Sequence, residues 1–110
     1  MGFRTSHVVT DRINAAQDRL IAARLRSGRR ALRIARENLR RWMARDGGKV
    51  RPVFLEWRCI LVRLTSGEIA DFLQSDTPMA RRLRQSSPFA GVLSEAERRA
   101  IRRRHEKAGA

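Results

Sequence analysis

Apolar and basic positions alternate at helical spacing through the first half of the chain. From Ile21, apolar or small residues recur in alternating steps of four and three, at positions 21, 25, 28, 32, 35, 39 and 42. This spacing is typical of the buried seam of an α-helix. Thr10 and Asp11 supply a capping side chain and an acid for the positive end of the helix dipole. Because Asp-Gly-Gly at 46–48 stops a helix, we predict helical structure over residues 10–46, after a flexible N-terminus over residues 1–9.

Gly28 lies on this seam and leaves the number of helices open. Glycine inside a helix costs about 1 kcal/mol relative to alanine. It therefore marks either a break after Ser27 or a close contact between helices. We expect one long Arg-rich helix or a pair of helices in this part of the chain.

Pro52 begins the most apolar segment of the chain. Proline suits the first turn of a helix, and apolar residues follow it at helical spacing. These residues are Phe54, Trp57, Ile60, Leu61 and Leu64. We predict that this helix is the centre of the core, and that Cys59 within it is a small buried apolar side chain.

Capping signals predict two short helices after this segment. Thr65 and Glu68 have the spacing of a capping box, which opens a helix at residue 66. Residues 76–78, Asp-Thr-Pro, begin another helix that reaches about Gln85. It stops there because Pro88 disfavours helical backbone in the residue before it.

The last part of the chain predicts a connector and a final helix. Residues 89–93 are mostly apolar, and we expect them to pack into the core. Ser94 and Glu97 form the clearest capping box in the sequence. They begin an Arg-rich helix that we expect to end near Arg104, followed by a flexible C-terminus over residues 105–110.

Together these elements predict an all-α fold. It is a small helical bundle in which a long N-terminal Arg-rich helix, or a helix pair, is followed by three or four shorter helices. The chain has 110 residues, which suits one domain, here residues 10–104. The low aromatic content of 5% and the absence of tyrosine fit packed helices better than a β-sandwich.

The charge is large and unevenly distributed. The formal net charge is +14, and residues 24–51 carry 11 basic against 2 acidic residues. The region 81–110 carries 9 against 3, whereas residues 52–80 carry 2 against 4. Two basic blocks around a mildly acidic middle are typical of a protein that binds a polyanion.

The arginines of the first block predict where that polyanion binds. On a continuous helix, six of them fall within an arc of roughly 120°, opposite the apolar seam. They are Arg26, Arg29, Arg30, Arg33, Arg36 and Arg40. The stripe would extend about 21 Å and contains one acid, Glu37, so we expect it to follow phosphates along a nucleic acid. An acidic protein surface remains the alternative, and five C-terminal arginines could extend the footprint. These are Arg98, Arg99, Arg102, Arg103 and Arg104.

Residues 66–86 resemble a helix-turn-helix. Ile69 and Ala70 belong to a first helix, and Ala80 and Leu83 to the inner face of a second. Its outer face carries the remaining candidate nucleic-acid-binding residues, Arg81, Arg82 and Arg84. Gln74 stands where the turn usually has glycine, and a corner between two ordinary bundle helices gives the same pattern.

The residue types offer little catalytic chemistry. His7 and His105 lie near the ends of the chain without acidic or cysteine partners at metal-ligand spacing. Cys59 is the only cysteine, which excludes a disulfide framework and fits a reducing compartment. We therefore expect no enzyme activity, no catalytic or metal-binding residues and no cofactor. No run of 18 uncharged apolar residues and no signal-peptide core occurs, so we expect a cytoplasmic protein without a membrane partner.

Three segments, residues 35–42, 56–57 and 80–93, resemble small bacterial antitoxin-like proteins encoded beside nucleotidyltransferase-type toxins. The similarity covers about residues 30–104. It implies a protein that docks on a toxin and binds its own promoter. It also implies a candidate docking segment, Arg84, Gln85, Ser86, Ser87, Pro88 and Phe89.

Two hypotheses follow for the function. The first is a non-enzymatic helical regulator of the antitoxin type, which binds a partner protein, and nucleic acid through its arginines. The alternative is a structural small subunit of a nucleoprotein complex that holds the DNA or RNA backbone without reading sequence. The sequence leaves open whether the polyanion is DNA, RNA or an acidic protein, and whether the chain forms homo-oligomers.

Overall fold

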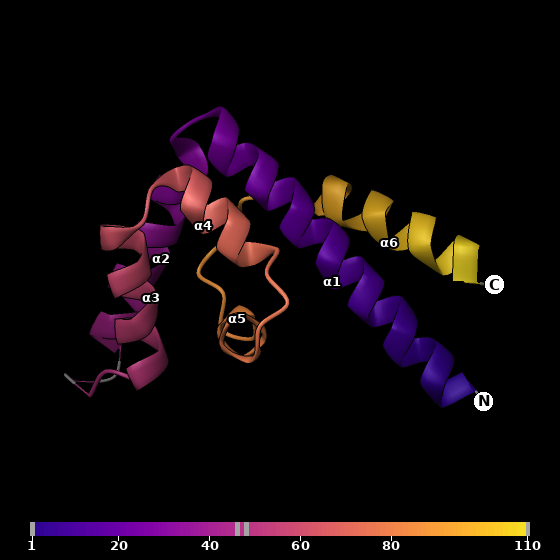
Figure 1. Cartoon of the computed structure of the whole chain (residues 1–110), viewed down its shortest axis with the longest axis horizontal. Coiled ribbons are helices and arrows are strands. Elements are labelled where there is room, and N and C mark those ends of the chain that lie inside the picture. The colour runs from indigo at the N-terminus through magenta and orange to yellow at the C-terminus, as the bar shows by residue number, and fades with distance from the viewer. Residues whose placement is uncertain (1, 46, 48, 110) are drawn as a thin grey trace.

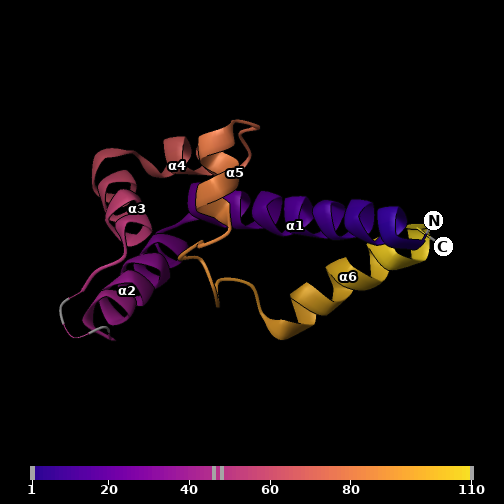
Figure 2. The same ribbon diagram turned by 90° about the horizontal axis from the view of Figure 1, so that it is seen from below.

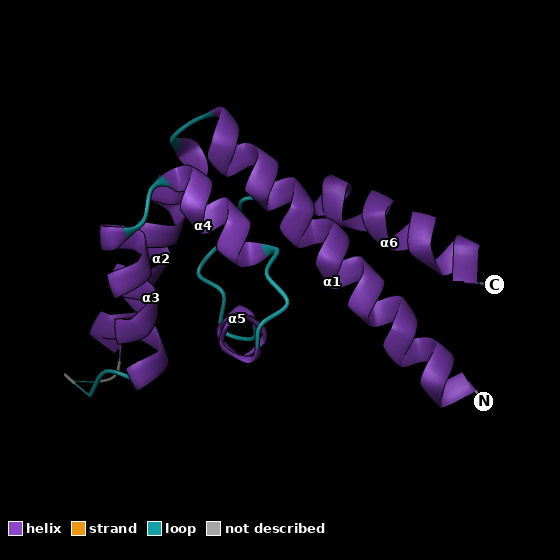
Figure 3. Cartoon of the chain, viewed as in Figure 1, coloured by secondary structure: helices purple, strands orange, loops and turns teal. Residues whose placement is uncertain are grey.

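The computed structural model describes residues 2–45, 47 and 49–109, with the side chains of 7–45, 47 and 49–107. These residues form helices and no strand, which confirms the predicted all-α fold (Figure 3). In chain order the helices are α1 (Gly2–Ser27), α2 (Arg30–Arg45), α3 (Pro52–Arg63), α4 (Ser66–Leu73), α5 (Pro78–Arg84) and α6 (Glu95–Gly109).

The helices form two arms that share a core. In Figures 1 and 2, α6 returns along α1 toward the end where both termini lie, while α2 and α3 form an antiparallel pair at the opposite end. Helix α4 packs on α1, and α5 lies beneath the junction of the two arms. Figure 1 shows α5 end-on while α4 lies across the view, so these two short helices cross steeply.

The long N-terminal helical region is a pair of helices and not one piece. Helix α1 ends at Ser27 and α2 begins at Arg30, so the break falls at Gly28. The helical hydrogen bonds of α2 begin one residue before Arg30, because Arg33 N donates to Arg29 O over 3.0 Å. A Cβ added to Gly28 would meet no atom within 4 Å, which excludes a close helix contact at this glycine.

The predicted capping sites begin the later helices. The Thr65 hydroxyl accepts from Glu68 N, and the Glu68 carboxylate accepts from Thr65 N. Ser94 and Glu97 form the same reciprocal pair at the start of α6. Thr77 caps α5 by accepting from the backbone N–H of residue 80. These side chains satisfy backbone donors that a helix start leaves unpaired.

Trp57 lies at the centre of the core, as predicted for its helix, and has no exposed surface. Its indole N–H donates to Leu83 O over 2.9 Å, which joins α3 to the end of α5. Phe72 and Phe89 meet the indole edge-on, with ring centroids at 5.7 and 6.0 Å. Edge-to-face packing of this kind adds to the free energy gained by burying the rings.

Residues 85–94 connect α5 to α6 across the core, and the predicted apolar part of this connector is confirmed as buried at Phe89, Val92 and Leu93. The buried Asn38 of α2 holds the connector, because its amide donates to Pro88 O and Ala90 O over 2.8 Å each. Removing such a buried donor would leave two carbonyls unpaired.

Three expectations were wrong. Helix α1 includes residues 2–9, which we expected to precede the helix, and α6 continues past Arg104 to Gly109. The backbone of α1 continues through the candidate cap at Thr10, and α6 packs along α1. Cys59 is exposed and not buried, because the buried face of α3 is the opposite one, centred on Trp57.

None of the described helices is long and apolar enough to cross a membrane.

Two glycines should respond oppositely to alanine. Gly28 has open space around it and lies outside the left-handed region, so Gly28→Ala should raise the free energy of unfolding by about 0.4–1 kcal/mol. Gly91 has φ +88°, where a Cβ is strained, so Gly91→Ala should lower it by about 1–2 kcal/mol. Urea unfolding of both variants measures this. A loss of stability in Gly28→Ala would show that the break requires glycine.

Candidate functional site

The outer face of α2 carries an arginine stripe. Arg29, Arg33, Arg36 and Arg40 follow one another in steps of four, three and four, which places them within an arc of about 60° over about 16 Å. All four are exposed. Among the described residues, only Arg40 of this stripe has an ion-pair partner. We call these four residues the α2 arginine stripe.

Contrary to the prediction, Arg26 and Arg30 do not belong to this stripe. The predicted stripe of about 21 Å needed one continuous helix, and the break at Gly28 leaves Arg26 on α1. Arg26 forms an ion pair with Asp71 of α4. Arg30 lies on α2 but donates to Val92 O over 3.1 Å, so its guanidinium is directed toward the connector.

The acid on α2 neutralises one member of the stripe. Glu37 accepts two hydrogen bonds from Arg40, one of them over 3.2 Å. These bonds lower the pKa of Glu37 and raise the pKa of Arg40. Because this pair is exposed, it contributes little to stability. Residues 29–45 still carry seven arginines against one glutamate.

The three predicted nucleic-acid-binding arginines of α5 are each paired with an acid. Arg81 lies 3.1 Å from Asp76, and Arg82 lies 2.6 Å from Glu56 of α3. Hydrogen bonds from Arg82 lower the pKa of Glu56. Over α4 and α5, residues 66–84 contain three basic and three acidic residues, so this region has no net charge to attract a polyanion.

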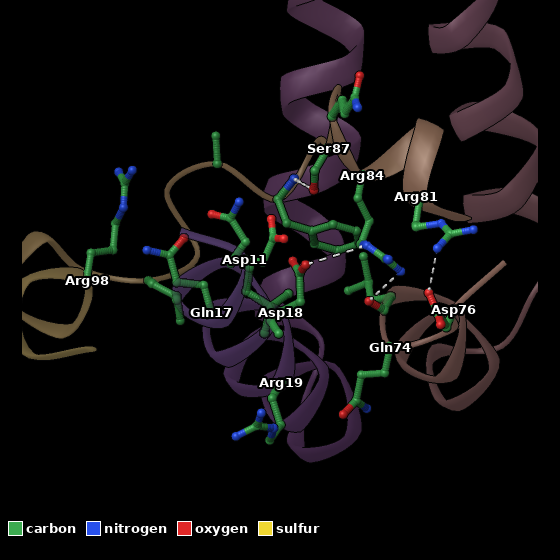
Figure 4. Close-up of a pocket in the computed structure, with 18 of the residues that line it drawn as sticks. Asp11, Gln17, Asp18, Arg19, Gln74, Asp76, Arg81, Arg84, Ser87 and Arg98 are labelled. Atoms are coloured by element: carbon green, nitrogen blue, oxygen red, sulfur yellow. Dashed lines mark hydrogen bonds and ion pairs between the residues drawn. The ribbon is translucent and has the colours of Figure 1, made fainter. Parts of the chain in front are cut away.

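Arg84 belongs to a groove between α1, α4, α5 and the connector. The groove has a volume of about 920 Å³, and Figure 4 shows Arg84 pointing into it toward Asp18 of α1. The Arg84 Nε lies 3.9 Å from an Asp18 carboxylate oxygen. The same guanidinium donates to Leu73 O over 3.2 Å and to Ser75 O. Arg84 therefore holds α1, α4 and α5 together.

Asp18 is the most perturbed titratable group of the described residues. Its side chain is 18% exposed. Burial raises the pKa of the Asp18 carboxyl to about 6, and the Arg84 guanidinium offsets only part of that rise. A carboxyl that titrates near neutrality can exchange protons. No described cysteine lines the groove with Asp18. The serine that lines the groove, Ser87, accepts a hydrogen bond from Phe89 N over 3.3 Å.

The predicted docking segment divides between the groove and the core. Arg84, Gln85, Ser87 and Phe89 line the groove, whereas Ser86 is half-buried outside it. Pro88 and Phe89 are almost fully buried. A partner on this face would therefore meet mainly the polar side chains of the segment, because Phe89 lines the groove but is only 2% exposed.

Sequence reasoning missed Asp18 and Asn38. Asp18 stands three residues before Ile21 and seven before Leu25, so it lies one turn upstream on the apolar seam. A polar residue on a buried face is the signal that could have identified it. The same applies to Asn38, which stands seven residues after Ala31 and three after Ala35, both of them buried.

Within the part of the chain that the structure describes, no three His, Cys, Asp or Glu side chains lie close enough to hold a metal ion. His7 is exposed and His105 is half-buried.

Comparisons with protein-family models, with curated proteins and with solved structures found no match for this chain. The resemblance to antitoxin-like proteins therefore stays a prediction.

The perturbed carboxyl predicts a pH-dependent stability. The pKa of Asp18 in the folded protein, about 6, lies above the unfolded value of about 3.9. The native state then holds a proton that the unfolded chain releases, so this residue lowers stability as pH rises from about 4 to about 6. Asp18→Asn should therefore gain about 1–3 kcal/mol more, relative to wild type, at pH 7.5 than at pH 4.

Urea unfolding of both proteins at the two pH values measures this difference. Glu56→Gln is the matched control, because the pKa of Glu56 is lowered and its charged form stabilises the fold above pH 4. That variant should change with pH in the opposite direction. Equal gains of Asp18→Asn at both pH values would contradict the raised pKa.

Proposed function

We propose that the chain is a non-enzymatic protein that holds a nucleic-acid backbone on the α2 arginine stripe without reading base sequence. The observation that carries this proposal is the separation of charge in the fold. The stripe keeps its positive charge, whereas the arginines of α5 have acidic partners.

The stripe suits phosphates in geometry and in chemistry. Guanidinium groups bind phosphate oxygens through paired hydrogen bonds. Four of them along about 16 Å can follow several successive phosphates. Arg33 and Arg36 have no acidic partner among the described side chains. Bringing an anion to them therefore breaks no ion pair.

The aromatic side chains that the structure describes are not available for stacking on bases. Trp57 and Phe89 are buried, and Trp42 packs on Phe54 with ring centroids at 5.5 Å. Proteins that bind single-stranded bases present exposed rings. Backbone contact is therefore the mode that the surface favours.

A regulator of the antitoxin type is the second candidate. The observation that favours it is the steep crossing of α4 and α5, joined by residues 74–77 (Figure 1), an arrangement used by helix-turn-helix proteins. In that role α5 would enter the major groove. Arg81 and Arg82 would first exchange their acidic partners for DNA.

The salt dependence of binding separates the two surfaces. Affinity for a duplex of random sequence, measured by fluorescence anisotropy, should fall linearly with salt on logarithmic axes. Arg33→Gln with Arg36→Gln removes two phosphate contacts. It should reduce the slope by about 1.8, because each contact contributes about 0.9.

The matched control is Arg81→Gln with Arg82→Gln, which makes the same charge change on α5. We expect its slope to equal that of wild type. If the α5 variant flattens the slope and the α2 variant does not, the stripe is not the interface. A preference for one duplex over a scrambled one would favour the regulator. Absence of binding by wild type at low salt would exclude both nucleic-acid functions.

A further inference from the structure

Helix α3 exposes a line of apolar side chains on the face opposite the core. Leu55, Cys59 and Val62 follow one another at i, i+4 and i+7, so they share one side of the helix. Leu55 is 38% exposed and Val62 is 74% exposed, and Cys59 is exposed as well. Apolar lines with this spacing pack against a second helix.

This line borders an apolar groove between α2 and α3. Leu39 and Met43 of α2 and Leu61 of α3 line the groove, and Val62 forms its edge. Its volume is about 340 Å³. Methionine is a flexible side chain that adapts to an apolar ligand, so the groove can receive the apolar side chains of a docked helix.

Three arginines surround the groove. Arg36 and Arg40 belong to α2, and Arg58 reaches the groove from α3. The acid beside them on α2 is Glu37, which pairs with Arg40. The groove thus combines an apolar floor with a cationic rim.

This combination selects its occupant. A second copy of this chain would bring the same arginines and a further charge of +14 against the rim, which disfavours self-association. A nucleic-acid backbone has no apolar side chains to fill the floor. An amphipathic helix with Leu-type residues on one side and carboxylates along its edges fits both parts.

We propose that the groove between α2 and α3 docks an acidic amphipathic helix of a partner protein. The apolar face of that helix covers Val62 and fills the groove. Its carboxylates pair with the arginines of the rim. The proposal does not depend on nucleic-acid binding, although Arg36 and Arg40 belong to both surfaces.

The test uses the full chain and a fluorescein-labelled helical peptide. The peptide has Leu at alternating third and fourth positions and Glu at the others, and fluorescence anisotropy measures its binding. Val62→Asp and Arg58→Glu should each weaken binding at least about ten-fold, because one adds a like charge to the apolar edge and the other reverses a rim charge. Both residues are exposed, so the variants keep the fold, which circular dichroism verifies.

Two matched controls make the same changes on the other arm. Val8→Asp alters an exposed valine of α1, and Arg102→Glu alters an exposed arginine of α6. Each should change the affinity less than about two-fold, since screening by salt limits the reach of a distant charge. A peptide with Lys in place of Glu should not bind.

Cys59 supplies a second readout that does not depend on charge. It is the only cysteine of the chain, so a maleimide reacts there alone. The bound peptide should slow this reaction in wild type and in Val8→Asp, but not in Val62→Asp.

Three outcomes would overturn the proposal. One is no saturable binding of the acidic peptide up to about 1 mM. Another is an equal loss of affinity in the groove variants and in the controls, which would indicate general attraction to a cationic protein. The third is a wild-type dimer that Val62→Asp converts to a monomer in sedimentation experiments, which would assign the groove to a second copy.

Discussion

The packing of this fold depends on the burial of one indole ring. Trp57 contacts aromatic rings from α4 and from the connector, and its N–H is satisfied by the carbonyl at the end of α5. Four segments that are separate in sequence therefore meet on one side chain. Because an indole buried without a partner for its N–H is unfavourable, the position of α5 is determined by α3. Helices of seven and eight residues are too short to be stable alone, so this contact allows them to exist.

The same packing decides which charges remain available. By placing α4 and α5 between the two arms, the core brings Asp71, Glu56 and Asp18 next to arginines of other segments. These acids are distant in sequence from their partners, so a count along the chain does not reveal the pairing. Arg33 and Arg36 of α2 have no acidic partner among the described side chains and keep their charge. The asymmetric distribution of unpaired charge on the surface thus comes from tertiary structure as much as from composition.

Much of the fold could be predicted from the sequence because its signals are local. Capping boxes at Thr65 and Ser94, and prolines at the starts of α3 and α5, act within one helical turn. The all-helical fold and the buried connector followed from periodicity. The limits of α1 and α6 did not, because α1 continues through the candidate cap at residues 10–11 and α6 continues past residue 104 while packed along α1.

The candidate site was less predictable for the same reason. The α2 arginine stripe follows from spacing alone, but the engagement of Arg26 and of the arginines of α5 depends on acids brought from elsewhere in the chain. Cys59 shows the difficulty clearly. An apolar run has two candidate buried faces, and only the position of Trp57 shows which one faces inward.

The connector between α5 and α6 also sets the angle between the two arms. Asn38 and Arg30 of α2 hold its backbone, and the helix that follows it is fixed on α1. The connector therefore links α2 to α6, and the break at Gly28 alone does not determine the angle between the two arms. Its length in residues controls the direction in which α2 faces. An insertion between residues 85 and 94 would rotate the arginine-bearing arm relative to α1 while every arginine stays in place on its own helix.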